Sequence, residues 1–443
     1  MLVRMLLLAA MAAATMPVAA QQAASLQTSV QQQLPGLTET YKHLHENPEL
    51  SRHEDKTAAY MAERLQKLGY TVTQHVGKYA DGTQADGLVA VMENGAGPRL
   101  LLRTELDALP VTEKTGVDYA SKVTAKNTQG LEVGVMHACG HDLHMTVMLG
   151  VAQEMAENRK QWHGTLMIIG QPAEEVIEGA QAMLADHIYE RLGRPDYVLS
   201  EHDSAEVPAG SIAMKGGPLL AADATLNVTM RGIGAHGSAP QVGKDPIVMA
   251  AEFVLLAQTI VSRQINPQDP AVLTVGMIHG GTKNNIIPDS VEMGLTLRTY
   301  TQAVEDKVIA AVRRTAKGIA EANGVPEDRM PVVTLTESTP VTYNDPALVE
   351  RLRAPAIAAL GKDRVEEARS IMGSEDVGLF TLGGKIPGMM YWLGAAEPTK
   401  LAESRKTGVP LPGPHSPLFA PDYEPAITTG VTAMTAMAMN LLK

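Results

Sequence analysis

The sequence predicts an α/β protein: a mixed, mostly parallel sheet with helices on both faces, into which a smaller ferredoxin-like α+β domain is inserted. Three observations predict this organisation. At 443 residues the chain is too long for one ordinary core. Short apolar runs alternate with segments of helical spacing towards both ends, and the middle changes to strands of alternating polarity. We therefore expect a discontinuous larger domain at 25–218 and 333–443, and an inserted domain at 219–332.

The first twenty residues, "MLVRMLLLAAMAAATMPVAA", are typical of a secretory signal peptide. They contain a basic Arg4, an apolar run too short for a good membrane span, and small residues before two glutamines. We expect this segment (1–20) to be cleaved and the protein to be periplasmic or extracellular. The alternative is an uncleaved anchor. No later segment is expected to cross a membrane, so the mature chain should have no membrane contact.

The larger domain is expected to begin with helices and continue as buried strands. Residues 34–76 predict two helices, broken at Pro48 and ended at Gly69, and then a strand. "GLVAVME", "RLLLRTEL" and "GTLMIIGQ" are short apolar runs, typical of strands covered on both faces, and "MTVMLGVAQEMAEN" between them predicts a helix. Strands that alternate with helices indicate a mostly parallel sheet, and ligands gather at the carboxyl ends of such strands.

The sequence of the inserted domain predicts its elements in the order strand, helix, two strands, helix, strand. Its strands are expected at "TLNVTMRG", "AVLTVGMIHGG", "SVEMGLTLRTY" and "MPVVTLTEST", and its helices at "DPIVMAAEFVLLAQTIVSR" and "VEDKVIAAVRRTAKGIAEANG". This order is that of a small open-faced α+β sandwich. The larger domain then resumes with a helix at "PALVERLRAPAIAALG".

Charge excludes one class of partner. The formal net charge is −12 and no run of Lys or Arg occurs, so the chain has no basic surface for a polyanion. We expect no nucleic acid partner.

The segment "MHACGHDLHM" contains the only cysteine of the chain and three of its thirteen histidines. An exported protein usually pairs its cysteines in disulfides, so an unpaired Cys139 is a packing residue, a reactive group or a metal ligand. Gly140 allows a tight turn that would bring Cys139 and His141 to one metal pair. The alternative is a packed cysteine beside polar histidines at a helix start. His137 and His144 are expected to support the ligands or to lie at the surface.

Two adjacent acids, Glu174 and Glu175, follow the buried strand "TLMIIG". Neighbouring carboxylates repel each other and lose solvation unless they share a cation or a proton. One acid as a metal ligand and the other as a general base would explain the pair, and a solvated helix start is the alternative.

His202 in "YVLSEHD" follows another strand-like run, and His415 in "GPHSPLF" lies between prolines. Each histidine alone could be incidental. Together with Cys139, His141 and Glu175 they give five N, O and S donors that suit one or two transition-metal ions. A serine hydrolase is disfavoured because no G-x-S-x-G elbow occurs, and a cysteine hydrolase would leave the two acids unexplained.

An ordered set of motifs resembles a known family. The motifs are "LDALP", "MHACGHD", "QPAEE", "GAHGSAPQVGKDPI", "GGTKNNIIPD", "LRT", "MGSED" and "PHSPLF". They are similar to those of the dinuclear metallo-amidohydrolases and metallopeptidases related to aminoacylase, in the branch of the hippurate hydrolases and the auxin-conjugate (indoleacetyl amino acid) hydrolases. Three local departures, Gln241, Glu105 and "SEDVGLF", lie where that family shapes its substrate pocket.

The resemblance implies a role for each matching residue. The metal ligands would be Cys139, His141, Glu175, His202 and His415. Glu174 would be the general base and Asp107 a supporting acid. The inserted domain would be a lid and dimerisation domain. Its His236 would reach the active site of a second copy to stabilise the oxyanion, and its Asn285 and Arg298 would bind the substrate.

The reaction implied is hydrolysis of an N-acyl (or aryl) amino acid or small peptide to a carboxylate and a free amino acid. It would use two divalent ions per subunit (Zn, Mn, Co or Ni) and a homodimer formed through the lid. A dipeptidase or carboxypeptidase on the same scaffold is the alternative within enzymes. An exported binding protein that retained the metal and lost catalysis is the alternative outside them.

Overall fold

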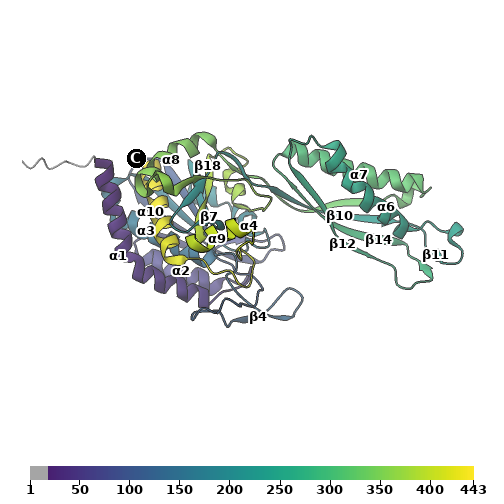
Figure 1. Cartoon of the computed structure of the whole chain (residues 1–443), viewed down its shortest axis with the longest axis horizontal. Coiled ribbons are helices and arrows are strands. Elements are labelled where there is room, and N and C mark those ends of the chain that lie inside the picture. Colours follow the sequence, from purple (N-terminus) through teal and green to yellow (C-terminus); the bar gives the residue numbers. More distant parts are fainter. Residues whose placement is uncertain (1–17) are drawn as a thin grey trace, which may run out of the picture.

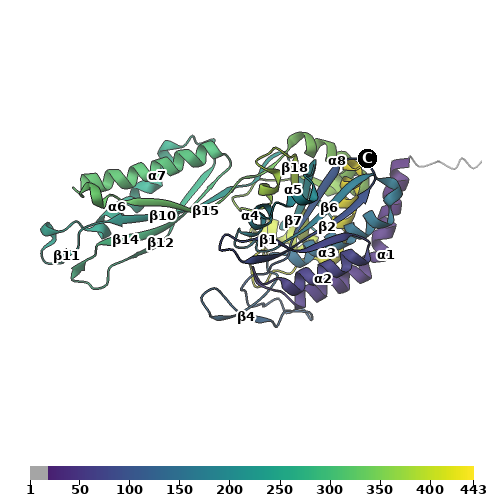
Figure 2. The same cartoon turned by 180° about the vertical axis from the view of Figure 1, so that it is seen from behind.

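The computed structural model describes residues 18–443 and has two lobes joined by extended strands (Figure 1). The predicted signal peptide lies outside the described residues, except for its last three positions, with which α1 (Val18–Glu46) begins. The two views in Figures 1 and 2 show the smaller lobe projecting from the larger one, with β11 at its far end.

The larger lobe is built on one eight-stranded sheet in the order β1-β2-β6-β3-β7-β18-β8-β17. Four of its seven pairings are parallel: β6 with β3, β3 with β7, β7 with β18, and β8 with β17. The other three, β1–β2, β2–β6 and β18–β8, are antiparallel. Its strands are β1 Thr71–Lys78, β2 Gln84–Asn94, β3 Arg99–Glu105, β6 Gly164–Gln171, β7 Tyr197–Pro208, β8 Ile212–Met214, β17 Val365–Glu367 and β18 Gly388–Ala396.

Helices cover both faces of this sheet. Leu100 and Leu102 of β3 face a core shared with α1, α2, α3, α8 and α10, and Leu101 faces a second core shared with α4 and α5. Because successive strand residues point to opposite faces, a continuous apolar run fits a strand buried on both sides. These helices, with α9, are α2 Asp55–Lys67, α3 His141–Glu157, α4 Gly179–Ala185, α5 Ile188–Leu192, α8 Pro346–Leu360, α9 Pro398–Thr407 and α10 Tyr423–Leu441.

The smaller lobe is a four-stranded antiparallel sheet in the order β12-β14-β10-β15, with α6 and α7 against it. Its elements, with the short pair β11–β13, are β10 Ala222–Arg231, β11 Ala235–His236, α6 Pro246–Thr259, β12 Ala271–Gly280, β13 Ile286–Ile287, β14 Ser290–Thr299, α7 Gln302–Ala322 and β15 Val332–Thr339. Two further small sheets join β4 Thr124–Lys126 to β5 Glu132–Gly134, and β9 Gly217–Leu220 to β16 Thr342–Asn344.

The structure corrects three details of the sequence expectations. The strand that completes the small sheet runs to Thr339, so the boundary expected at 332 comes too early. Helix α1 begins at Val18, before residue 34, where the first helix was expected, and it contains Pro35. Pro246–Gln264, α6 followed by a π-turn, has the length and hydropathy of a membrane span, contrary to expectation, and packs Phe253 into the small core.

Candidate functional site

The predicted metal ligands meet at one edge of the large sheet. Glu105, the last residue of β3, lies beside Gln171, the last residue of β6. His202 lies in β7, two residues after Ser200, which is the last residue of β7 that pairs with β3. Asp107, Glu174 and Glu175 come just after two of these strand ends. The parallel strands therefore bring their polar ends together at one place, as expected for a ligand site in such a sheet.

Cys139 and His141 enter this edge from the turn that begins α3. Gly140 adopts a left-handed φ of 79° at the helix start, and a Cβ there would lie 2.2 Å from Asp203 Oδ1. Only glycine can make this turn against the Asp203 carboxylate. The helix begins at His141, four residues before the expected start at Met145. His141 and His144 therefore project from its first turn.

All five predicted ligands converge. Cys139 Sγ lies 3.3 Å from His415 Nε2 and 3.5 Å from His202 Nε2. Glu175 contacts two of the histidines, with Oε2 3.4 Å from His415 Nε2 and Oε1 3.9 Å from His141 Nε2. Overlapping triads of these side chains each place three donor atoms within 4.8 Å of one another.

The donor set fits a divalent transition-metal centre. Within residues 18–443, two buried atoms of this donor set have no hydrogen-bond partner: His141 Nε2 and Glu175 Oε1. Buried polar atoms are normally satisfied, and an unpartnered carboxylate oxygen in a dry site is costly. A cation would satisfy nitrogen and oxygen together, and thiolate, imidazole and carboxylate are donors that such ions accept.

Neighbouring groups orient the ligands. The Nδ1 of His141 donates to the carbonyl oxygen of Asp107 over 2.7 Å, which leaves Nε2 turned towards the acids. The Asp107 carboxylate accepts from Glu175 N at 3.0 Å and from Ser51 Oγ at 2.6 Å. His202 is held by its own strand, with Nδ1 2.9 Å from the carbonyl oxygen of Asp203.

Burial and nearby negative charges raise the pKa values of the acidic groups in the site. Burial, and then the charges of Glu375 and Glu175, hold the pKa of Glu174 well above its usual range. Burial raises the pKa of Glu175 to about 7, and burial with the charge of Glu175 raises the pKa of the Cys139 thiol. A bound cation would favour the charged form of each group. Glu174 Oε2 lies 3.8 Å from His141 Nε2, so a carboxylate able to accept a proton faces the donor set.

A buried charge network, which the sequence motifs did not predict, lies behind these groups. The Arg103 guanidinium, fully buried in β3, bonds Gln171, Glu105, Glu375 and Asp376. His144 continues the network, with Nδ1 3.0 Å from Glu105 and Nε2 3.1 Å from Asp203. The available signal was a set of polar residues inside strands that otherwise read as apolar, in "LLLRTE" and "MIIGQ". His137 and His144 are both buried, which excludes a surface position for either.

The lid residues lie apart from the donors within one chain. His236 and Asn285 are exposed and neighbour each other near β11, where Gly237 N donates to the carbonyl oxygen of Asn285 over 2.8 Å. Figure 1 shows β11 at the end of the small lobe farthest from the large sheet. Arg298, at the other end of that lobe, bonds Ser374 of the larger lobe and lies 3.3 Å from Asp223.

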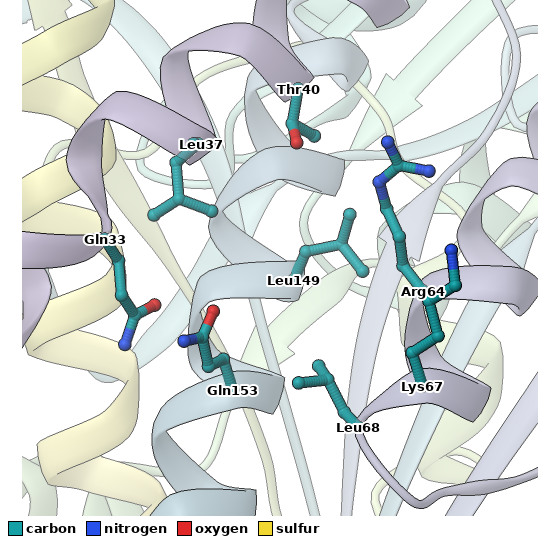
Figure 3. A pocket seen from close by; sticks show the side chains of 9 residues that line it. Gln33, Leu37, Thr40, Arg64, Lys67, Leu68, Leu149 and Gln153 are labelled. Atoms are coloured by element: carbon teal, nitrogen blue, oxygen red, sulfur yellow. The ribbon is translucent and has the colours of Figure 1, made fainter.

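A separate groove lies among α1, α2 and α3 (Figure 3). It has a volume of about 270 Å³, and its walls include Leu37, Leu68 and Leu149, with Arg64 and Lys67 at one side. Among the described residues, its lining contains none of the predicted ligands. The groove is therefore separate from the predicted metal site.

Comparison with known proteins identifies the family of the chain. Residues 101–407 match the family described as Peptidase family M20/M25/M40. The chain belongs to this family. It is accordingly a hydrolase of amide bonds, and the family predicted from its motifs is confirmed.

Three relatives show the range of named activities. The N-acetyldiaminopimelate deacetylase of Leuconostoc mesenteroides is 36% identical over 80% of this chain and 88% of its own length. The thermostable carboxypeptidase 2 of Saccharolobus solfataricus is 34% identical over 90% and 93%. The hippurate hydrolase of Campylobacter jejuni is 34% identical over 78% of this chain and 85% of its own.

Two solved structures share the architecture. A protein from methicillin-resistant Staphylococcus aureus superposes with a TM-score of 0.82 and 30% identity, covering 95% of this chain and 100% of that one. A Bacillus subtilis member of the M20 family, described as a dinuclear metal-binding peptidase, superposes with a TM-score of 0.73 and 27% identity, covering 95% and 99%. The predicted mixed, mostly parallel α/β fold is thus confirmed.

Proposed function

We propose that this protein hydrolyses the amide bond of N-acyl or N-aryl amino acids, releasing a carboxylate and a free amino acid. The observation that carries the proposal is a buried glutamate, Glu174, which faces five convergent N, O and S donors. The names of the deacetylase and hippurate hydrolase relatives support this substrate class, because both describe cleavage of an acyl group from an amino compound.

The five donors are proposed to hold two divalent ions, of which Zn, Mn, Co or Ni would suit them. The dinuclear relative supports the number, and the mixed thiolate, imidazole and carboxylate set supports the kind of metal. When bound, such ions polarise the amide carbonyl and make a water molecule more acidic.

Glu174 performs the proton transfers in this proposal. Its carboxylate accepts a proton from the attacking water, whose oxygen bonds to the carbonyl carbon. Glu174 then donates that proton to the amide nitrogen as the C–N bond breaks, so the amine leaves neutral and the acyl group leaves as a carboxylic acid. The acid passes its remaining proton to the freed amine, which gives a carboxylate and the ammonium form of the amino acid. Asp107 acts indirectly, because it holds the Glu175 backbone.

The lid would complete the site from a second copy of the chain. Within one chain His236 and Asn285 lie at the far end of the small lobe, so a homodimer through this lobe would bring them to the donors of the other chain. His236 would stabilise the oxyanion and Asn285 the substrate carbonyl. Arg298 would bind the substrate carboxylate, for which it must leave Asp223 and Ser374.

The surface of the small lobe supports a homodimer. Strand β12 is an edge of its sheet and leaves backbone groups available for pairing. Met277 and Ile278 on β12 are 45% and 53% exposed, and Val248 and Leu255 on α6 are 50% and 73% exposed. Exposed apolar residues gathered on one lobe are typical of an interface.

The apolar leader at 1–20 supports export to the periplasm or beyond.

A substrate panel tests the proposal. The purified mature protein is assayed for free amino acid release from N-acetyl, N-benzoyl and indoleacetyl amino acids and from unblocked dipeptides, before and after chelation. Chelator-sensitive release from the blocked substrates is expected. Cleavage of dipeptides alone would favour the peptidase alternative, which the carboxypeptidase relative supports. Bound metal with no hydrolysis of either class would favour a binding protein.

A further inference from the structure

The turn that carries Glu174 and Glu175 is strained. Ala173 and Ile177 have positive φ angles of 48° and 59°, which residues other than glycine rarely adopt. The carbonyl oxygen of Ala173 accepts from two backbone N–H groups farther along the turn, both over 3.1 Å. Such strain persists only where surrounding contacts fix the backbone, and it is typical of functional sites. The contacts that fix this turn therefore set where both acids point.

The contacts come from a segment distant in sequence, residues 51–54. Glu54 Oε1 accepts from Ala173 N over 2.7 Å, at the start of the turn. Arg52 Nε lies 3.2 Å from Glu178 Oε2, at its end. Ser51 Oγ donates to Asp107 Oδ2, the same oxygen that accepts from the Glu175 backbone. One short segment thus holds the turn at both ends and supports its middle.

Glu54 has no ordinary structural explanation. It occupies the N-cap position of α2, yet in the part of the chain that the structure describes its side chain makes no capping bond. Its carboxylate is fully buried, and its Oε2 has no partner among the described residues. Burying a carboxylate beside Asp107 without a cation is unfavourable for folding, and burial with the Asp107 charge raises the pKa of Glu54 to about 8.

We propose that Glu54 is a positioning residue for amide hydrolysis, whose side-chain oxygen fixes the backbone of Ala173 and so the direction of Glu174 and Glu175. This inference rests on the proposed function. It assigns Glu54 no contact with substrate. The Glu54 side chain is long enough for its Oε1 to reach Ala173 N. The same oxygen accepts from Arg52 N over 2.9 Å and so joins the two segments.

Two conservative variants separate reach from charge. Glu54→Gln keeps an acceptor oxygen at the same reach and removes the ionisable carboxyl group, whereas Glu54→Asp keeps the carboxyl group and withdraws it by one methylene. We expect Glu54→Gln to retain kcat within about threefold, and Glu54→Asp to lose about 10- to 100-fold in kcat, because small misplacements of catalytic groups are expensive. KM should change less than twofold in both.

Hydrogen exchange provides a measurement that does not depend on activity. Amides of a peptide spanning 172–179 should exchange faster in Glu54→Asp than in wild type and at the wild-type rate in Glu54→Gln. Glu49→Asp is the matched control, because the Glu49 side chain binds Thr57 at the start of the same helix. It should leave both kcat and exchange unchanged.

The inference fails if Glu54→Gln loses as much kcat as Glu54→Asp, if exchange at 172–179 is the same in all variants, or if Glu49→Asp reproduces the effect. A wild-type protein that releases no amino acid from any blocked substrate would instead refute the proposed function. In that case the exchange comparison alone decides whether Glu54 fixes the turn.

Discussion

The edge of the large sheet and the tip of the small lobe are built in opposite ways. At the sheet edge, Glu174 and Glu175 are nearly buried, and their neighbours, such as His144, make hydrogen bonds on both sides. At the tip, His236 is exposed and its Nδ1 accepts only from Ser238 among the described residues. A preorganised site needs a rigid shell, and the tip has none of its own. The difference fits the proposed arrangement, in which the sheet edge of one chain supplies the metal donors and the base, and the tip of a second copy completes the site.

The largest effect is expected when the proposed general base is removed and the proposed metal ligands are kept. Glu174→Gln should keep the metal content of wild type, because the five ligands remain, and should lose about 10²- to 10⁴-fold in kcat, as expected for loss of a general base. Metal analysis and steady-state kinetics on one preparation measure both quantities. Glu190→Gln, whose side chain is 73% exposed, is the control. Turnover close to that of wild type would refute the base assignment.

The tip can be tested by removing its histidine. His236→Ala should lower kcat about 10²- to 10³-fold, as expected for loss of an oxyanion donor, without changing metal content or thermal stability. His187→Ala, whose side chain is 74% exposed, is the control.

Mixing the two inactive variants tests whether the tip acts in a second copy. After subunit exchange, hybrids of His236→Ala with Glu174→Gln contain one site with an intact base and an intact histidine, so about one quarter of wild-type activity should return. If His236 served its own chain, no activity would return.

Only part of the sheet edge could be predicted from the sequence. The five proposed ligands and Glu174 could be identified as candidates because they stand in compact polar clusters beside apolar strands, in an order that matches a family. Arg103 and Glu54 were not, because an isolated charged residue carries no sign of the partners that folding brings to it. For Arg103 these partners include Glu375, 272 positions away. The fold class could be predicted from periodicity, and so could the last strand of the small lobe, "MPVVTLTEST". The boundary at 332 was placed inside that strand, which continues to Thr339.

The smallest expected effect is on the free energy of unfolding, through a buried histidine behind the site. His45 in α1 lies 2.6 Å from Asp142 and 3.2 Å from Glu113. Burial alone would lower its pKa, but hydrogen bonds and charges of these two acids raise the pKa of His45 to about 10. A raised pKa in the folded state stabilises the protein fully below the unfolded value of 6.5 and loses that contribution as the pH rises through 10.

His45→Asn should therefore lower the free energy of unfolding by about 3 kcal/mol at pH 7, as expected for a broken buried ion pair. The difference from wild type should shrink as the pH approaches 10. Denaturant unfolding at several pH values measures it, with His43→Asn, an exposed histidine of the same helix, as control. A difference that does not change with pH would show that His45 is not charged in the folded protein.

Titration of metal-free protein tests the central claim most directly. A divalent ion is added stepwise to the chelated protein, and release of amino acid from an N-acyl amino acid is followed at each step. We expect no activity without metal, and activity that rises to a plateau at about two equivalents per chain, because the donors at the sheet edge fit a metal pair. Full activity in the metal-free protein, or no activity at any metal content, would contradict the account.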